Sequence, residues 1–270
     1  MTTRVVITGV GGRMGSLLVK LVRDTAEFVL VGGTERPGSA PVGLDVGLAA
    51  HLGPLEVMTV ASLADALPKA DVVIDFTTPE ASIEHARLCA EKKVALVVGS
   101  TGFQPEARAR LAAAAKTIPV VLSPNMSVGV NVMIEVAALL AKRLGGDFDV
   151  DVLEAHHRMK KDAPSGTALR LAEELAKALG RAGSELRTTR SGLIGERSRT
   201  EIGVQALRGG DVVGEHTVYY FGDGERLELT HRTSSREQFG RGALRAARWV
   251  VGRAPGLYGM ADVLSEGARP

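Results

Sequence analysis

The sequence predicts an α/β protein in two parts: a parallel sheet covered by helices on both faces, and a second, mixed α+β part. Three observations lead to this fold class. Short apolar runs alternate with helical segments through residues 4–122, strand-like runs separated by glycine turns follow after residue 200, and the last long segment is helical again. With 270 residues, of which 45% are hydrophobic and 24% are charged, the chain is long enough to bury two cores.

The first part opens on a β-branched apolar run and repeats that pattern along the chain. Its strand-like runs are apolar at nearly every position, which is typical of strands buried on both faces of a parallel sheet. The helical segments between them supply the crossover connections that parallel strands require. The expected strands are residues 4–8, 28–33, 71–76, 94–98 and 119–122, and the expected helices are residues 14–22, 80–92 and 105–116.

The second part differs in its pattern. Residues 148–152 alternate apolar and polar side chains, as a half-buried strand does. Three later runs are separated by Gly209-Gly210 and by Asp223-Gly224, which are hairpin signals, and they predict an antiparallel meander. The three runs are residues 201–207, 212–221 and 226–233, and the expected helices are residues 131–144 and 237–251, the second of which is expected to return to the first part.

Composition excludes several classes of protein. The net charge is only +2, and the densest basic segment, residues 181–208, also holds Glu185, Glu196 and Glu201. We interpret that segment as a solvated loop face, and expect no nucleic-acid partner. No apolar run approaches the roughly 18 residues of a membrane span, and no secretory leader pattern is present. The single cysteine, Cys89, falls in a helical pattern, so we expect a packed thiol in a cytoplasmic protein.

Glycines 9, 12 and 15 lie between the first expected strand and the first expected helix. A dinucleotide-binding fingerprint lies at this place, because glycine permits the tight turn, the close approach of pyrophosphate and the close packing of the helix. The spacing is G-x-x-G-x-x-G and departs from the strict G-x-G-x-x-G. Glu35 stands twenty residues beyond Gly15 at the end of the second strand, where a carboxylate accepts hydrogen bonds from a ribose.

The identity of the dinucleotide stays open. Arg36 follows Glu35 directly and suits a 2′-phosphate, so the sequence is compatible with NADH and with NADPH. Arg36 is equally compatible with an ordinary surface cation, while Arg13 is placed to reach a phosphate. Loops 99–102 and 123–126 end later strands at the carboxyl edge of the sheet, where ligands of such folds bind. We expect them to line the nicotinamide half of the site.

Four titratable or cationic side chains, His156, His157, Arg158 and Lys160, lie within five positions. Histidine titrates near neutrality, and lysine is a compact positive charge with three donors. His156 and Lys160 share a face if the segment is helical, but Pro164 disfavours a helix just before it, so a loop is equally possible.

A Pro-Ser-Gly-Thr turn then leads into a helix expected at residues 167–179. Ser165 is a good N-cap, and Gly166 and Thr167 place backbone N–H groups at the start of the helix. Gly166 also removes side-chain bulk where a carboxylate would approach. Together with the preceding cations, this turn predicts a pocket for a multiply anionic small molecule, with a proton donor close by.

The alternative to a functional cluster is a polar strand end followed by surface lysines. That interpretation suits each histidine taken singly, but the concentration of groups before a helix start favours function. A metal site is disfavoured, because adjacent histidines point to opposite sides of a strand and no carboxylate or cysteine stands at ligand spacing. The isolated histidines, to which we assign no role, are His51, His85, His216 and His231.

These motifs resemble those of the 4-hydroxy-tetrahydrodipicolinate reductase (dihydrodipicolinate reductase) family. The likeness rests on residues 9–15, 123–131, 156–168 and 214–217 and covers essentially the whole chain. It implies NAD(P)H-dependent reduction of 4-hydroxy-tetrahydrodipicolinate to tetrahydrodipicolinate in diaminopimelate and L-lysine biosynthesis, by a cytoplasmic homotetramer. The expected domains are a Rossmann-like dinucleotide-binding domain, residues 1–125 and 237–270, and a substrate-binding and oligomerisation domain, residues 126–236.

The resemblance also implies a role for individual positions. His156 matches the proton donor/acceptor and Lys160 a proton donor, while His157, Gly166 and Thr167 match the substrate-binding groups. The positions that match cofactor contacts are Gly9, Val10, Gly11, Gly12, Arg13, Met14, Glu35, Arg36, Gly99, Ser100, Thr101, Ser123, Pro124, Asn125 and Met126. The chain departs from the family pattern at Met159, where some members have a third histidine, and at Ser100, where threonine is common.

Two other functions remain alternatives at this point. A reductase of the same build that acts on a different cyclic imino acid would not require the second carboxylate of the substrate. A non-catalytic dinucleotide sensor would bind NADH without turnover, but it would leave the cluster at residues 156–167 without a purpose.

Overall fold

A seven-stranded parallel sheet forms the first part of the structure, with strand order β12-β6-β5-β4-β1-β2-β3. Successive residues of one strand supply two different cores: Val5 and Ile7 belong to one apolar cluster, and Val6 belongs to the other. This alternation explains why the strands are apolar throughout. The strands are β1 (Thr3–Thr8), β2 (Phe28–Thr34), β3 (Thr59–Val60), β4 (Val72–Asp75), β5 (Ala95–Val98), β6 (Pro119–Leu122) and β12 (Gly256–Tyr258).

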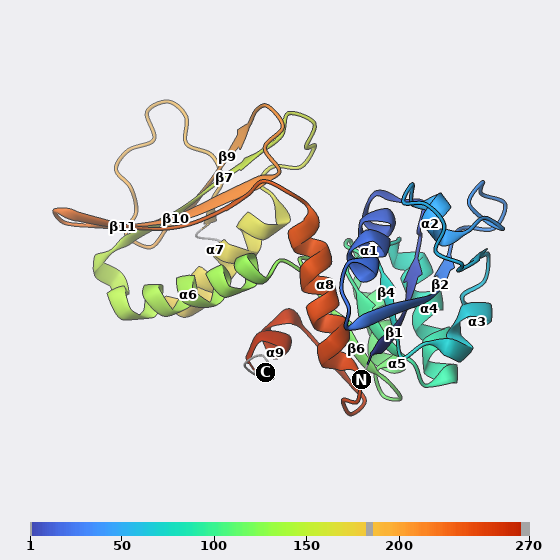
Figure 1. Cartoon of the computed structure of the whole chain (residues 1–270). Coiled ribbons are helices and arrows are strands. Elements are labelled where there is room, and N and C mark those ends of the chain that lie inside the picture. The colour runs from blue at the N-terminus through green and yellow to red at the C-terminus, as the bar shows by residue number, and fades with distance from the viewer. Residues whose placement is uncertain (1, 182–185, 266–270) are drawn as a thin grey trace. The chain divides into compact units, whose positions relative to one another are not determined.

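Helices cover both faces of this sheet, as the sequence predicts (Figure 1). Residues of α1, α8 and α9 pack in the cluster that contains Val5, and residues of α3, α4 and α5 pack in the cluster that contains Val6. Cys89 lies fully buried in α4, as expected for a packed thiol. The helices are α1 (Arg13–Arg23), α2 (Val46–Ala49), α3 (Leu63–Ala66), η1 (Leu67–Lys69), α4 (Pro79–Lys92), α5 (Pro105–Ala114), α8 (Glu237–Val250) and α9 (Met260–Ser265).

A mixed five-stranded sheet forms the second part, with strand order β11-β10-β7-β9-β8. Its buried side chains pack with those of α6 and α7, and both helices lie on one face of the sheet (Figure 1). The elements are α6 (Val128–Leu144), η2 (Gly145–Asp147), β7 (Asp149–His156), α7 (Gly166–Ala178), β8 (Leu186–Arg187), β9 (Ile202–Arg208), β10 (Gly214–Gly222) and β11 (Glu225–Thr233).

The computed structural model describes residues 2–181 and 186–265. The chain forms two compact units, residues 1–128 with 237–270, and residues 129–236. None of the helices in the described ranges combines the length and the apolar character needed to cross a bilayer.

The expected three-stranded meander is wrong in part. β10 and β11 do form an antiparallel hairpin, but β9 does not pair with β10. It lies parallel to β7, which separates it from β10. The reason is the helix α7: it returns the chain to the end at which β7 began, so the next long strand runs in the same direction as β7. The glycines between β9 and β10 therefore belong to a connection that passes over one strand.

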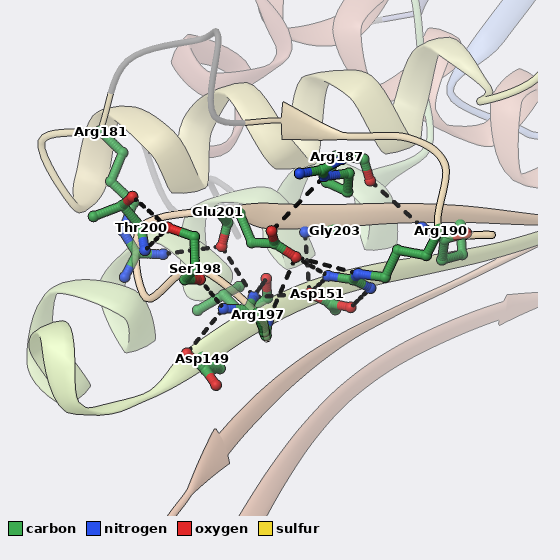
Figure 2. A network of polar contacts seen from close by, with 12 residues as sticks. Asp149, Asp151, Arg181, Arg187, Arg190, Arg197, Ser198, Thr200, Glu201 and Gly203 are labelled. Carbon is green, nitrogen blue, oxygen red and sulfur yellow. Dashed lines mark hydrogen bonds and ion pairs between the residues drawn. The ribbon is translucent and has the colours of Figure 1, made fainter. Parts of the chain in front are cut away.

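The basic segment between β8 and β9 is mostly exposed, as expected, but two of its arginines, Arg190 and Arg197, bind acidic groups at the sheet (Figure 2). Asp151 of β7 accepts hydrogen bonds from Arg190 Nη1 at 2.5 Å and from Arg197 Nη2 at 2.9 Å. Glu201 accepts a second bond from Arg190, from Nη2 at 2.6 Å. Asp151 stands opposite Gly203 of β9, where an added Cβ would lie 2.4 Å from its carboxylate, so only glycine leaves room for the network.

Candidate active site

The glycine turn that follows β1 is built around one close backbone approach. Gly9 has a φ of +66°, in the left-handed region that favours glycine. A Cβ on Gly15 would lie 1.9 Å from the carbonyl oxygen of Gly9, so the first turn of α1 packs on the turn at backbone distance. The glycine spacing of the sequence therefore corresponds to a physical requirement, although it departs from the strict fingerprint.

The N-terminus of α1 fits a phosphate group. Its N-cap is Gly12, which has no side chain to cap the first N–H groups, and Arg13 lies exposed in the first turn. Glu35, just after β2, accepts a hydrogen bond from Gly11 N at 3.1 Å. The structure thus brings the acidic residue and the glycine turn together, with uncapped donors and the positive end of the helix dipole alongside.

The other predicted cofactor positions differ in accessibility. β4, β5 and β6 are neighbours in the sheet and run parallel, so the loops at residues 99–102 and 123–126 follow the same edge. Ser100 is buried and its hydroxyl lies 2.9 Å from that of Ser82, and the buried Ser123 hydroxyl donates to the carbonyl of Asn125 at 2.8 Å. The buried positions of this set are Val10, Ser100, Ser123 and Met126. The exposed positions are Gly11, Gly12, Arg13, Arg36, Thr101 and Pro124. The half-buried positions are Gly9, Met14, Glu35, Gly99 and Asn125.

A hydrogen-bonded pair that no sequence motif indicated, Asp75 and His85, lies at the same edge of the sheet. Asp75 at the end of β4 is fully buried and its Oδ2 lies 2.7 Å from His85 Nδ1. Its Oδ1 accepts the hydroxyl of Thr77 at 2.6 Å and the backbone N–H of Thr77 at 2.9 Å. Burial opposes the charge of Asp75, but these hydrogen bonds outweigh it and lower its pKa. His85 is therefore not an isolated histidine: with Asp75 it fixes the loop beside Gly9.

In the second unit, the predicted histidines stand at the end of β7. His156 is the last residue of the strand, and residues 157–165 form a loop, which settles the alternative between helix and loop. His157 N donates to Val212 O at 2.7 Å, and Lys160 N donates to His157 O at 3.1 Å. The Lys160 ammonium lies 2.9 Å from Asp162 Oδ1. Backbone bonds therefore hold the start of this loop against the connection that precedes β10.

Glu154 is the most heavily bonded group in this region, and the sequence analysis did not select it. Its side chain is fully buried, and it accepts hydrogen bonds through both carboxylate oxygens. Oε2 lies 2.5 Å from His156 Nδ1 and 2.8 Å from Arg208 Nη1. Oε1 accepts from Arg208 Nη2 and from Ser165 N, each at 2.9 Å. Burial alone would raise the pKa of Glu154, but these bonds lower it to about 2.

α7 begins at Gly166 with Ser165 as its N-cap, as the sequence predicts. The side chain of Ser165 accepts a hydrogen bond from Ala168 N at 3.2 Å. Gly166 is exposed, and an added Cβ there would meet nothing within 4 Å, so the space in front of the helix is open. Thr167 is half-buried one residue further on. The N–H groups at a helix start, together with the positive end of the helix dipole, suit a carboxylate.

His216 was assigned no role, and the structure corrects this assignment as well. It is buried on β10 directly opposite Glu154, and its Nε2 lies 3.2 Å from Ser165 Oγ. Its ring stands edge-on to that of His156, with centroids 5.3 Å apart. Burial lowers the pKa of His216 to about 4, and neighbouring His156 adds to the effect, so the ring is neutral at neutral pH.

Strand alternation is the sequence signal that would have identified Glu154. Val150, Val152 and Glu154 share one face of β7, and all three are buried. His156 is the next residue on that face. A glutamate that continues an apolar row needs partners, because a buried charge is costly without them. No signal in the sequence connects this position to Arg208, which is 54 residues away along the chain.

Comparison with known proteins identifies the family over both units. Residues 3–126 match the family description "Dihydrodipicolinate reductase, N-terminus", and residues 129–264 match "Dihydrodipicolinate reductase, C-terminus". A solved structure of a dipicolinate-bound dihydrodipicolinate reductase from Paenisporosarcina sp. TG-14 is 26% identical. It has a TM-score of 0.78, with 97% of this chain and 99% of that chain covered.

Two curated relatives are much closer in sequence. The 4-hydroxy-tetrahydrodipicolinate reductase of Myxococcus xanthus (strain DK1622) is 65% identical over 263 residues, which is 97% of each chain. The enzyme of the same name from Anaeromyxobacter dehalogenans (strain 2CP-C) is 59% identical over the same lengths. Since the likeness covers both units, this chain is an oxidoreductase that belongs to the dihydrodipicolinate reductase family.

Proposed function

We propose that this protein reduces 4-hydroxy-tetrahydrodipicolinate to tetrahydrodipicolinate with NADH or NADPH, in diaminopimelate and L-lysine biosynthesis. One observation carries the assignment of chemistry to the second unit. A single buried carboxylate, Glu154, binds both the ring of His156 and the N-cap residue of α7, Ser165. A proton-carrying group and an anion-binding helix terminus are thereby fixed to one another, as reduction of an anionic substrate requires.

The first unit would hold the dinucleotide. The uncapped start of α1 suits the pyrophosphate, and Glu35 suits the adenosine ribose, with Arg36 beside it for a 2′-phosphate. The loops at residues 99–101 and 123–126 would line the nicotinamide half, through their backbone where the side chains are buried. A bound nicotinamide supplies the hydride, and the protein supplies binding and orientation.

The second unit would bind the substrate and manage its proton. His156 and Lys160 are the proposed proton donors, and each already has a carboxylate partner, Glu154 and Asp162. His157 and the N–H groups of Gly166 and Thr167 are the proposed partners of the two substrate carboxylates. The relative whose structure is dipicolinate-bound supports a small dicarboxylate as the ligand class.

The same resemblance supports two finer proposals. We infer a cytoplasmic enzyme, in keeping with its one buried cysteine. We also infer a homotetramer assembled through residues 126–236. Size measurement by light scattering of the purified chain tests the second proposal, since a monomer or a dimer at working concentration would reject it.

The direct test follows the loss of reduced-nicotinamide absorbance when substrate is generated in place by the preceding synthase. General acid catalysis typically contributes ~10²–10⁴-fold, so His156→Ala should lower kcat by that factor while the Kd for NADPH stays unchanged. Lys160→Ala should act in the same direction. Wild-type rates in both variants would reject these two residues as proton donors. A panel of cyclic imino acids with one carboxylate serves as the control for specificity, because equal turnover of that panel would favour the alternative reductase.

A further inference from the structure

Glu154 constrains the chemistry of His156 more tightly than a single hydrogen bond would. The carboxylate has four donors around it, His156 Nδ1, two nitrogens of Arg208 and Ser165 N, at distances of 2.5 to 2.9 Å. Its pKa of about 2 leaves it ionised at neutral pH. An ionised carboxylate only accepts hydrogen bonds. The hydrogen in the short contact therefore belongs to His156 Nδ1.

This assignment fixes the tautomer of the imidazole. With the hydrogen on Nδ1 directed toward Glu154, the nitrogen without a hydrogen in the neutral ring is Nε2. Nε2 faces the start of β10, where an added Cβ on Gly214 would lie 3.1 Å from it. Among the residues that the structure describes, none forms a hydrogen bond with Nε2. Neutral His216, edge-on to the ring, adds no second positive charge beside it.

Arg208 extends the same network to the other proposed proton donor. Its guanidinium binds Glu154 in a bidentate manner, and Nη2 also donates to the backbone carbonyl of Asp162 at 2.6 Å. The side chain of Asp162 in turn binds the Lys160 ammonium at 2.9 Å. Hydrogen bonds thus connect His156 through Glu154 and Arg208 to the backbone of Asp162, and the side chain of Asp162 binds Lys160.

We propose that Glu154 and Arg208 are positioning residues of the reductase site, an inference that rests on the proposed function. Glu154 holds His156 in the Nδ1–H form and aims Nε2 at the substrate, and Arg208 fixes Glu154 and the loop that carries Lys160. The reaction releases the 4-hydroxyl of the substrate as water, and hydride addition to the dehydrated, unsaturated ring leaves that ring with one more negative charge. A proton from Nε2 of the imidazolium neutralises that charge, and the imidazole remains neutral with its hydrogen on Nδ1.

Nitrogen NMR of protein labelled with ¹⁵N-histidine reads the tautomer directly, without substrate. His156 is assigned by comparison with His156→Gln. The wild-type spectrum should show a hydrogen on Nδ1, with Nε2 as the nitrogen that titrates. Glu154→Gln should lose this preference and lower kcat ~10–100-fold, the range seen when the orienting partner of a functional histidine is removed, with an unchanged Kd for NADPH.

Glu201→Gln is the matched control, because Glu201 is also a carboxylate paired with an arginine in this sheet and does not contact His156 (Figure 2). It should keep the wild-type tautomer and kcat. Arg208→Lys should keep the charge, lose the bidentate geometry and fall between wild type and Glu154→Gln in kcat.

A wild-type His156 with its hydrogen on Nε2 and a bare Nδ1 would overturn the proposal. This measurement needs no substitution, so it decides the matter even if Glu154→Gln does not fold. Wild-type kcat together with a wild-type tautomer in Glu154→Gln would overturn it too. A wild type with the Nδ1–H form but no reductase activity would reject the proposed function, and with it the role in reduction, while the orientation of His156 would stand.

Discussion

At the scale of single residues, His216 is a buried imidazole whose neutrality has a measurable consequence. Its pKa is about 4 in the folded protein, because burial and the neighbouring His156 disfavour its charged form, while an unfolded chain gives histidine a value of 6.5. Between these values the unfolded state binds a proton that the folded state does not. The stability that the neutral His216 ring contributes to the free energy of unfolding is therefore fully present above pH 6.5, and it is lost as the pH falls toward 4.

We predict that His216→Gln removes this dependence. The unfolding free energy of the wild type should fall between pH 6.5 and pH 4 by on the order of 3 kcal/mol more than that of the variant. Denaturant titrations at the two pH values measure the difference. His51→Asn is the control, since His51 is exposed and has a φ of 61° that asparagine tolerates. Equal pH dependence in wild type and His216→Gln would contradict the assignment of a neutral buried ring.

A substitution at Gly166 is expected to change the binding of substrate without changing the stability of the fold. Its Cβ position is open, so Gly166→Ala should leave the unfolding free energy within about 0.5 kcal/mol of the wild type or raise it slightly. The methyl group stands where a substrate carboxylate is proposed to bind, and KM for the dicarboxylate should rise by at least ~10-fold, about 1.4 kcal/mol of binding. The KM for NADPH should not change.

Gly146→Ala is the matched control for this prediction, because Gly146 is another exposed glycine with open space around its Cβ position and lies in η2. It should leave both KM values unchanged. An unchanged KM for the dicarboxylate in Gly166→Ala would move the proposed carboxylate site away from the start of α7.

The residues of the candidate site were predictable to different degrees. His156, His157 and Lys160 are visible in the sequence because titratable groups crowd before a helix start. Glu154 was within reach of strand alternation, since it continues a buried row. Arg208 was not, because the pairing of β7 with β9 brings it to Glu154 and a local pattern holds no information about that pairing.

At the scale of elements, the contact between β1 and α1 depends on glycine. An alanine Cβ at Gly15 would lie 1.9 Å from the carbonyl oxygen of Gly9, a backbone atom that cannot move without opening the turn. We predict that Gly15→Ala raises the Kd for NADPH by at least ~10-fold and lowers Tm. Calorimetric titration and a thermal melt measure the two effects. Wild-type affinity in a folded variant would show that the turn does not shape the dinucleotide site.

The elements with strong patterns were predicted well. β6 has the expected bounds, and α1, α4, β2 and α8 lie within two residues of theirs. The wrong prediction concerned which strand pairs with β9. The glycines after β9 suggested a hairpin with β10, whereas the crossover through α7 makes β9 a parallel neighbour of β7. Strand pairing of this kind depends on where a helix packs, and no turn motif encodes it. The two- and three-residue strands β3, β8 and β12 are too short for a periodic signal.

At the scale of the whole molecule, the chain leaves its first unit near residue 128 and returns to it at residue 237. Two glycines of α8 make close contact with the first unit. A Cβ on Gly242 would lie 1.7 Å from Met126 O, and a Cβ on Gly240 would lie 2.4 Å from the side chain of Leu21. Glycine at both positions lets the helix pack against the end of the first segment and against α1. The N-terminal and C-terminal segments thus share one of the two cores of the first unit, the one that contains Val5, while residues 129–236 build a core of their own.

Every role proposed above depends on hydride transfer from a nicotinamide to the dicarboxylate substrate by this protein. The most direct measurement supplies NADPH that carries deuterium at both C4 positions and determines the mass of the product by mass spectrometry. We predict a tetrahydrodipicolinate that carries one carbon-bound deuterium for each NADPH consumed. Product without deuterium, or oxidation of NADPH that yields no reduced product, would contradict it.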